Sequence, residues 1–264
     1  MVKIARFHQD GVAHHALVET GGMLRIIEGD LYGAWRATGQ RVPMQQVKLL
    51  APVDPPNIIA IGLNYRAHAQ ESQMPLPERP IIFLKATTTV CGPDEPILLP
   101  KMAPDEVDYE CELAIVMGKA AHNVSPEAAF SYVLGYTCAN DVSARDCQIR
   151  LDKQWARGKS FDTFAPLGPW IETDLDPERA PLRSRLNDRV MQDSNTSDLI
   201  FSCRELIVYL SQCMTLLPGT VIMTGTPSGV GAARTPPVFL RPGDVIEIEV
   251  EGIGVLRNSV KAEE

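Results

Sequence analysis

The chain has 264 residues, of which 45% are apolar and 22% are charged, and its formal net charge is -8. These values are typical of a globular protein with one large domain, or with one small and one larger domain. The acidic balance lacks the excess of Lys and Arg that nucleic-acid binding needs, and no apolar run reaches the roughly 18 residues of a membrane span. The six cysteines are scattered and no signal-peptide pattern is present, so we expect reduced thiols and a cytoplasmic location.

The first 50 residues predict short strands joined by turns. Examples are VKIARF, HHALVET and MLRIIEG, which are separated by glycine-containing turns. The segment APVDPPN (51–57) contains three prolines and predicts a boundary between a small N-terminal domain, residues 1–54, and a larger domain, residues 55–264. Beyond this boundary, three apolar runs predict buried strands: IIAIGLNY, PIIFLKA (80–86) and CELAIVMG.

The second half of the chain adds the predicted helices. SPEAAFSYVLG (125–135) opens with a serine cap followed by a proline, which predicts the start of a helix. SCRELIVYLSQCMTL (202–216) has apolar residues three and four apart and is the strongest predicted helix. TVIMTG predicts a strand, and the strict alternation of DVIEIEVEG predicts a half-exposed strand. Strands outnumber helices without regular alternation, so the sequence predicts an α+β, β-rich fold and not a doubly wound parallel sheet.

The segment DYECELAIVMG (108–118) places acids at every second position at the start of a predicted buried strand. Asp108, Glu110 and Glu112 share one face, which becomes apolar after Glu112. Carboxylates that enter the interior side by side repel each other and lose hydration, and a divalent cation relieves both effects. The alternative is a strand end whose acids reach water. A second apolar run, YVLGYTCAND, ends in Asp141 and favours the metal site, although a helix cap would also explain this acid.

Further candidates lie outside the acidic strand. GLNYRAHAQE (62–71) places His68 and Glu71 three residues apart, so that a carboxylate on the same helical face can orient a histidine that acts as a general base. An exposed helix with an incidental ion pair is the alternative. In WARGKSFDTFAPLGPW, Lys159 would stabilise an oxyanion at an active site, or would be an ordinary surface lysine. TGTPSGVG (224–231) predicts a tight turn that presents backbone N–H groups and Thr226 to a ligand.

Together these segments resemble the fumarylacetoacetate hydrolase family from residue 57 to the end of the chain. The resemblance rests on GLNYRAHAQE, DYECELAIVMG, ANDVSARDCQ, GKSFDTFAPLGPW and TGTPSGVG, in the order found in the family. It implies a rolled, mixed β-sheet of the fumarylacetoacetase C-terminal type, a small N-terminal β domain and a homodimer. The short N-terminal segment is closer to the bacterial dioate isomerase and acylpyruvase-like branch than to the long eukaryotic hydrolases.

The resemblance also implies roles for individual residues. One Mg²⁺ or Mn²⁺ per chain would be bound by Glu110, Glu112 and Asp141, since oxygen ligands suit both ions. The catalytic residues would be His68, Glu71 and Lys159. The positions that match substrate contacts are Arg145, Gln148 and Thr226.

The activity implied first is metal-dependent hydrolysis of a C–C bond in a small 1,3-dicarbonyl, acylpyruvate-like acid through an enolate. Related enolates also serve two alternatives. One is an isomerase of 2-hydroxyhepta-2,4-diene-1,7-dioate or 5-carboxymethyl-2-hydroxymuconate type in aromatic catabolism, and the other is a decarboxylase of a 2-oxo acid such as oxaloacetate. Outside enzymes, the alternative is a catalytically silent, metal-stabilised binding protein, which would have no need for His68, Glu71 and Lys159.

Overall fold

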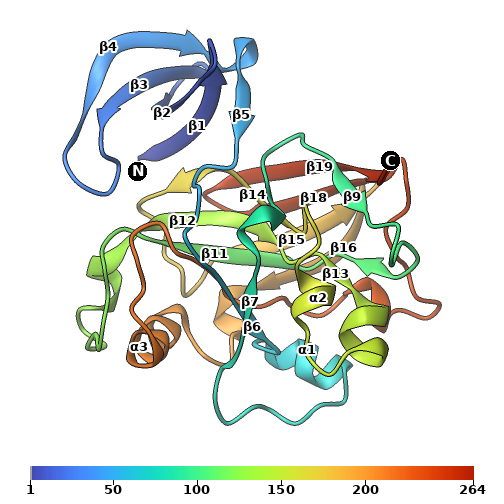
Figure 1. Cartoon of the computed structure of the whole chain (residues 1–264). Coiled ribbons are helices and arrows are strands. Elements are labelled where there is room, and N and C mark those ends of the chain that lie inside the picture. Colours follow the sequence, from blue (N-terminus) through green and yellow to red (C-terminus); the bar gives the residue numbers. More distant parts are fainter. Residues whose placement is uncertain (1) are drawn as a thin grey trace.

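The computed structural model describes residues 2–264, which form a small N-terminal lobe above a larger β-rich body (Figure 1). The strands of the lobe are β1 (Lys3–Gln9), β2 (Val12–Glu19), β3 (Met23–Gly29), β4 (Trp35–Pro43) and β5 (Lys48–Leu50). The first three strands were predicted. Strand β4 was not, because its sequence, WRATGQRVP, mixes polar and apolar residues without regular alternation.

The lobe continues into the central sheet of the body, whose strands follow the order β4-β3-β2-β1-β14-β12-β11-β17-β6-β7. The strands that the body contributes are β6 (Ile58–Gly62), β7 (Ile81–Lys85), β11 (Cys111–Met117), β12 (Val133–Asn140), β14 (Ala165–Glu172) and β17 (Val221–Met223). Strands β17 and β6 are parallel, whereas β11 and β12 are antiparallel, so the sheet is mixed. The link to the lobe is short, because β1 pairs with β14 through only Lys3 and Ile4.

A second sheet packs against the central sheet and encloses the main apolar core between them. Its order is β16-β15-β18-β19-β9, with strands β9 (Ile97–Leu99), β15 (Pro181–Leu186), β16 (Arg189–Asn195), β18 (Val245–Val250) and β19 (Gly254–Ala262). Strand β18 alternates between buried and half-buried residues, as its sequence predicted. Three short strands complete the body: β8 (Val90–Cys91), β10 (Val107–Asp108) and β13 (Ser143–Ala144).

The helices are few and short. They are α1 (Arg66–Glu71), α2 (Ala156–Lys159) and α3 (Cys203–Cys213), together with a π-helical turn at Asp146–Leu151. Single 3₁₀ turns lie at Met44–Gln46, Thr87–Thr89, Ala129–Tyr132, Thr196–Asp198 and Gly231–Ala233. Helix α3 confirms the strongest predicted helix and begins with a capping box between Ser202 and Glu205. No helix within residues 2–264 is long and apolar enough to cross a membrane.

Two predictions about local structure are wrong. Residues 125–135 contain a 3₁₀ turn at Ala129–Tyr132, and the chain then enters strand β12. Pairing of β12 with β11 on one side and β14 on the other outweighs the helix-start signal, and too few residues remain for an α-helix. Strand β7 was expected to be buried, but it ends the order of the central sheet, and its Leu84 is 54% exposed.

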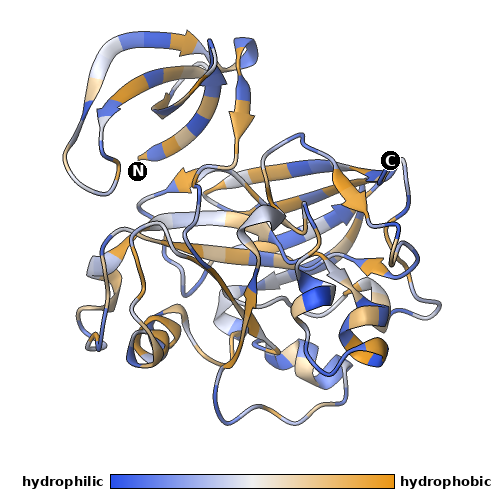
Figure 2. Ribbon diagram, viewed as in Figure 1, coloured by the Kyte–Doolittle hydropathy of each residue, from blue (hydrophilic) through white to orange (hydrophobic). Residues whose placement is uncertain are grey.

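Hydropathy follows this architecture (Figure 2). Hydrophobic residues dominate β11, all of whose residues are buried, whereas the N-terminal strands and β18 alternate between hydrophobic and hydrophilic residues. A strand that is buried on both faces reads as a continuous apolar run. The polar residues at the start of β11 are therefore placed inside the body by the strand that follows them.

Gly135 of β12 offers a test of this packing. A Cβ atom at Gly135 would lie 2.5 Å from the backbone oxygen of Glu172 in the neighbouring strand β14. We expect Gly135→Ala to lower the free energy of unfolding, at the upper end of the roughly 1–3 kcal/mol that overpacking costs, in urea titrations. The control is Gly39→Ala in the exposed strand β4, where a Cβ atom has no neighbour within 4 Å. Equal unfolding midpoints for the two variants would contradict the close approach of β12 and β14.

Candidate active site

Three buried carboxylates meet where β11 and β12 are paired. Glu112 lies in β11, Glu110 directly precedes that strand, and Asp141 directly follows β12. The antiparallel register pairs Cys111 with Asn140, so the start of β11 lies beside the end of β12. The amide of Asp141 donates a 3.0 Å hydrogen bond to the carbonyl of Glu110, which extends this pairing. One oxygen from each of the three carboxylates lies within 4.8 Å of the others.

Three cationic side chains surround these acids. Lys159 Nζ lies 2.8 Å from Glu110 Oε2 and 2.7 Å from Asp141 Oδ2. Lys85, at the end of β7, forms a second ion pair with Asp141, and Arg145 Nη1 lies 2.6 Å from Glu110 Oε1. The side chains of Lys85 and Lys159 are 0% and 2% exposed. Ion pairs at this depth are stable only when the charges are paired and hydrogen-bonded, as those of Glu110 and Asp141 are.

The pKa directions separate Glu112 from Glu110. Burial acts to raise the pKa of Glu110, but Lys159 and then Arg145 outweigh burial and lower this pKa. For Glu112, burial and then repulsion by Asp141 and Glu110 raise the pKa well above its usual range. Glu112 is therefore the acid of this cluster whose charge is least compensated by the protein.

The donor set fits a hard divalent cation. Within residues 2–264, Glu112 forms no ion pair, and its hydrogen-bond donor is the amide of Gly225, 2.8 Å from Oε2. A cation shared by Glu112, Glu110 and Asp141 would remove the repulsion that raises the pKa of Glu112. Three carboxylates provide the oxygen ligands that Mg²⁺ and Mn²⁺ prefer.

His68 and Glu71 lie on one face of α1. His68 Nδ1 is 3.1 Å from Glu71 Oε2, and the two side chains are 14% and 24% exposed. The amide of Gly229 donates hydrogen bonds of 2.9 and 3.1 Å to the two oxygens of Glu71. Glu71 is thus fixed by the backbone and in turn orients the imidazole ring, leaving Nε2 as the free nitrogen when Nδ1 donates to Glu71.

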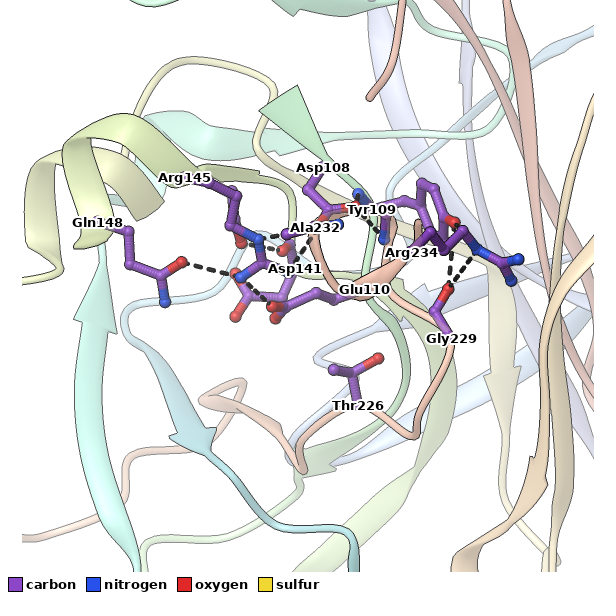
Figure 3. A network of polar contacts seen from close by, with 12 residues as sticks. Asp108, Tyr109, Glu110, Asp141, Arg145, Gln148, Thr226, Gly229, Ala232 and Arg234 are labelled. Carbon is purple, nitrogen blue, oxygen red and sulfur yellow. Dashed lines mark hydrogen bonds and ion pairs between the residues drawn. The ribbon is translucent and has the colours of Figure 1, made fainter. Parts of the chain in front are cut away.

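Arg145 lies between the acidic cluster and a further buried acid, Asp108 (Figure 3). Its Nε donates to Asp108 Oδ2 at 2.9 Å, and its Nη1 donates to Gln148 Oε1 at 2.8 Å. Gln148 belongs to the π-helical turn, a conformation that is frequent at functional sites. Asp108 holds the guanidinium group through Nε. Nη1 of Arg145 therefore faces Glu110 and Gln148.

The glycine-rich segment 224–231 differs from its prediction. Its amides were expected to bind a ligand, but three of them bind carboxylates of the protein itself. Gly225 donates to Glu112 at 2.8 Å, Gly229 to Glu71 at 2.9 Å, and Gly231 to Asp108 at 2.8 Å. One loop therefore connects the acidic cluster, the His68–Glu71 pair and the acid that holds Arg145.

Thr226, in the same loop, is buried, and its hydroxyl is engaged by the protein. Oγ1 donates to the carbonyl of Cys111 at 3.0 Å and accepts from Gln192 Nε2 at 2.7 Å. Figure 3 shows Thr226 across the site from Gln148. A substrate contact by Thr226 stays a prediction, and the hydroxyl proton is already used to hold the loop on β11.

A single cavity of about 620 Å³ joins these groups, and its volume is within the usual range for small-molecule sites. All the predicted site residues except Glu112 line it: His68, Glu71, Glu110, Asp141, Arg145, Gln148, Lys159 and Thr226. Glu112 is 1% exposed and lies behind the cavity wall. Residues from distant parts of the chain thus face one space.

The burial of Lys85 and the pairing of Asp108 with Arg145 were missed by the sequence analysis. Lys85 ends the run PIIFLK, and a lysine in that position after an apolar strand is the only sequence signal of its burial. Asp108 was recognised as an acid on the face of Glu110, but its partner Arg145 follows a different strand. Pairing between β10 and β13, which brings the two segments together, is not visible in local sequence.

Comparisons with known families and proteins agree with this geometry. The family model described as fumarylacetoacetate (FAA) hydrolase C-terminal matches residues 57–261, and the one described as Rv2993c-like, N-terminal matches residues 2–52. The mitochondrial oxaloacetate tautomerase Fahd2a of Rattus norvegicus is 45% identical, and the match covers 83% of this chain and 71% of that protein.

Two solved structures are similar over almost the whole chain. The 2-hydroxyhepta-2,4-diene-1,7-dioate isomerase from Mycobacterium marinum is 39% identical with a TM-score of 0.89, and 100% of this chain and 99% of that chain are covered. The 5-carboxymethyl-2-hydroxymuconate delta-isomerase from Mycobacterium smegmatis is 44% identical with a TM-score of 0.89, and 99% of this chain and 100% of that chain are covered.

Glu112→Gln tests the cation site. The metal-free variant should melt no lower than the wild-type protein, because the neutral amide replaces a carboxyl group whose charged form is disfavoured by burial and by two neighbouring acids. Its affinity for Mn²⁺ in calorimetry should fall by more than the roughly 10–100-fold that loss of an outer-shell partner costs, and the rise in Tm with Mn²⁺ should disappear. The control is the exposed Glu251→Gln. Wild-type Mn²⁺ affinity in Glu112→Gln would exclude Glu112 as a ligand.

Proposed function

The chain belongs to the fumarylacetoacetate hydrolase family and is an enzyme of that family, and we propose that it interconverts the keto and enol forms of a small 2-oxo acid such as oxaloacetate. The observation that carries this proposal is the meeting of a histidine–carboxylate pair and a buried carboxylate–lysine cluster in one cavity. Such a site can move a proton at carbon while it stabilises charge on oxygen. The names of the tautomerase and isomerase relatives support this class of reaction.

His68 is the proposed base. With Nδ1 oriented by Glu71, Nε2 takes a proton from the carbon next to the 2-oxo group. The electron pair of the broken C–H bond forms the C=C bond, the π pair of the 2-oxo group moves to its oxygen, and a proton from solvent water on this oxygen completes the enol. In the reverse direction, the protonated His68 returns its proton to carbon.

Lys159 is the proposed charge stabiliser. Burial acts to lower its pKa, but Asp141 and Glu110 outweigh burial and raise the pKa above its usual value. Lys159 therefore stays protonated and serves as a cationic hydrogen-bond donor and not as a base. Lys85 differs, because burial outweighs Asp141 and lowers its pKa.

The proposed cofactor is one Mg²⁺ or Mn²⁺ held by Glu110, Glu112 and Asp141, which would supply Lewis-acid stabilisation of the oxygen that gains charge. Charge balance supports this proposal. Four buried acids, Asp108 and the three proposed ligands, face the three cations Lys85, Lys159 and Arg145. With all seven groups ionised, the cluster carries one net negative charge. A divalent cation would change this to one net positive charge, which the negative charge of a substrate carboxylate would balance. Arg145 and Gln148 are the proposed contacts for that carboxylate.

Hydrolysis of an acylpyruvate, the activity implied first by the sequence, is the second candidate. It uses the same proton transfers and additionally needs a water molecule that attacks carbon. The cavity of about 620 Å³ is larger than a four-carbon acid fills, so it has room for a longer acylpyruvate. Release of pyruvate from acetylpyruvate would identify hydrolysis, whereas tautomerisation changes only the absorbance of the enol.

We also propose two domains and a homodimer for the whole molecule. The domain limits 1–54 and 55–264 are supported by the separate lobe of β1–β5 and by the proline-rich segment 51–57. The homodimer and the cytoplasmic location stay predictions. Sedimentation of the purified protein at micromolar concentration tests the dimer against the 29.0 kDa mass of one chain.

His68→Ala tests the proposed reaction. Loss of a general base should lower kcat for conversion of enol-oxaloacetate by about 10²–10⁴-fold, read as loss of enol absorbance with Mn²⁺ present. The affinity for Mn²⁺ should not change, because His68 is not one of the three grouped acids. Glu71→Ala should fall between the wild-type protein and His68→Ala, since Glu71 orients the ring without accepting the proton from carbon.

His122→Ala is the matched control, because His122 is exposed and lies outside the cavity lining. It should retain wild-type activity. Unchanged kcat in Mn²⁺-loaded His68→Ala would rule out the histidine as the base. Wild-type protein that accelerates neither enol decay of oxaloacetate nor cleavage of acetylpyruvate would overturn both candidate reactions.

A further inference from the structure

Trp155 and Gly62 form a contact in the cavity wall that none of the roles above uses. Trp155 directly precedes α2, the short helix that carries Lys159, and Gly62 is the last residue of β6. A Cβ atom at Gly62 would lie 2.5 Å from Cζ3 and 2.9 Å from Cη2 of Trp155. The indole therefore occupies the space that any side chain at position 62 would need.

The indole belongs to an apolar wall that begins at the buried lysine. The ring of Phe83 lies 5.1 Å from Lys159 Nζ, and Trp155 packs edge-on against Phe83 with ring centroids 5.5 Å apart. Ile61 and Ile81, from the adjacent strands β6 and β7, line the same cavity. The wall thus extends from the charged cluster through Phe83 to the indole.

This division of the cavity dictates how a 2-oxo acid would lie in it. The carboxylate and 2-oxo oxygens require cationic and hydrogen-bonding partners, which Lys159 and Arg145 provide at the acidic cluster. The carbon chain beyond the 2-oxo group then lies along the apolar wall, where its burial is favourable.

We propose that Trp155 is a specificity-determining residue that limits the length of the substrate chain beyond the 2-oxo group. Gly62 is the positioning residue, because its lack of a side chain lets the Cζ3–Cη2 edge of the indole approach β6 instead of lying further into the cavity. The inference rests on the proposed function only for the 2-oxo acid class of the ligand, and not for the reaction that follows binding.

The test measures binding and not turnover. N-alkyl oxamates from N-methyl to N-hexyl are stable 2-oxo acid analogues that differ only in chain length. Their dissociation constants would be measured by calorimetry on the full-length protein with Mn²⁺ present. The quantity compared among variants is the ratio of the N-methyl to the N-hexyl dissociation constant.

Trp155→Ala should raise this ratio by about fourfold for each methylene group that enters the vacated space. Trp155→Phe should give a smaller rise, because a smaller ring vacates less volume, and it provides a second variant if the alanine protein is unstable. The control Trp35→Ala, on the exposed strand β4, should keep the wild-type ratio. An unchanged ratio in both Trp155 variants would overturn the proposal.

Gly62→Ala should act in the opposite direction. The new methyl group would push the indole into the cavity and weaken binding of N-hexyl oxamate more than that of N-methyl oxamate. In the double variant Gly62→Ala, Trp155→Ala the methyl group meets no indole, so the ratio should equal that of Trp155→Ala. An equal effect of Gly62→Ala in both backgrounds would show that Gly62 does not act through Trp155.

The outcomes also separate this proposal from the proposed reaction. Chain-length shifts in a protein that does not convert enol-oxaloacetate would support the role of Trp155 and reject the tautomerase activity. Conversion of oxaloacetate with no chain-length shift would do the reverse. Failure of the wild-type protein to bind any oxamate would overturn the inference together with the 2-oxo acid class.

Discussion

The burial of like charges is the constraint on which the rest of this structure depends. Glu110, Glu112 and Asp141 present oxygens within 4.8 Å of one another in the interior of a β-rich body. Carboxylates at this depth are costly unless cations or hydrogen bonds compensate them. Lys85 and Lys159 supply cations from two different segments, one the end of an edge strand and the other a short helix. The proposed metal site would meet the same requirement for Glu112, which has no cationic partner among residues 2–264.

The glycine-rich loop after β17 explains why distant parts of the site form one unit. Its amides hold Glu112 in the acidic cluster, Glu71 in the histidine pair and Asp108 behind Arg145. Backbone amides have no side-chain rotamers. Their hydrogen bonds therefore orient each carboxylate independently of the side chain that it contacts. A shift of this loop would therefore move the proposed base, the proposed ligands and the proposed carboxylate contact together.

Sequence predicted the parts of the site that strand periodicity reveals. Glu110 and Glu112 alternate at the start of an apolar strand, and Asp141 ends another, so local patterns favoured a shared site, and the family resemblance then implied all three as ligands. Lys85 was missed because one lysine after an edge strand looks like a surface residue until the partner strand is known. Residues 125–135 were misjudged as the start of a helix for a related reason, since the pairing of β12 with β11 and β14, and not local propensity, decides where the strand begins. The contact between Trp155 and Gly62 depends on two segments that only the folded chain brings together.

The proposed roles of the charged end and the apolar wall of the cavity would explain why relatives bear different activity names. In the proposed function, the charged end, with Lys159, Arg145 and the acids, would recognise the 2-oxo carboxylate group that tautomerisation, isomerisation and hydrolysis share. That end is buried and held by matched ion pairs, so its geometry tolerates little change. The apolar wall beyond the contact of Phe83 with Lys159 is formed by packing, through Phe83, Trp155 and the backbone of Gly62. Packing contacts can change by single substitutions of modest cost, whereas loss of one partner from a buried ion pair is severe. Substrate range in this fold should therefore vary through the wall, while the chemistry at the charged end stays the same.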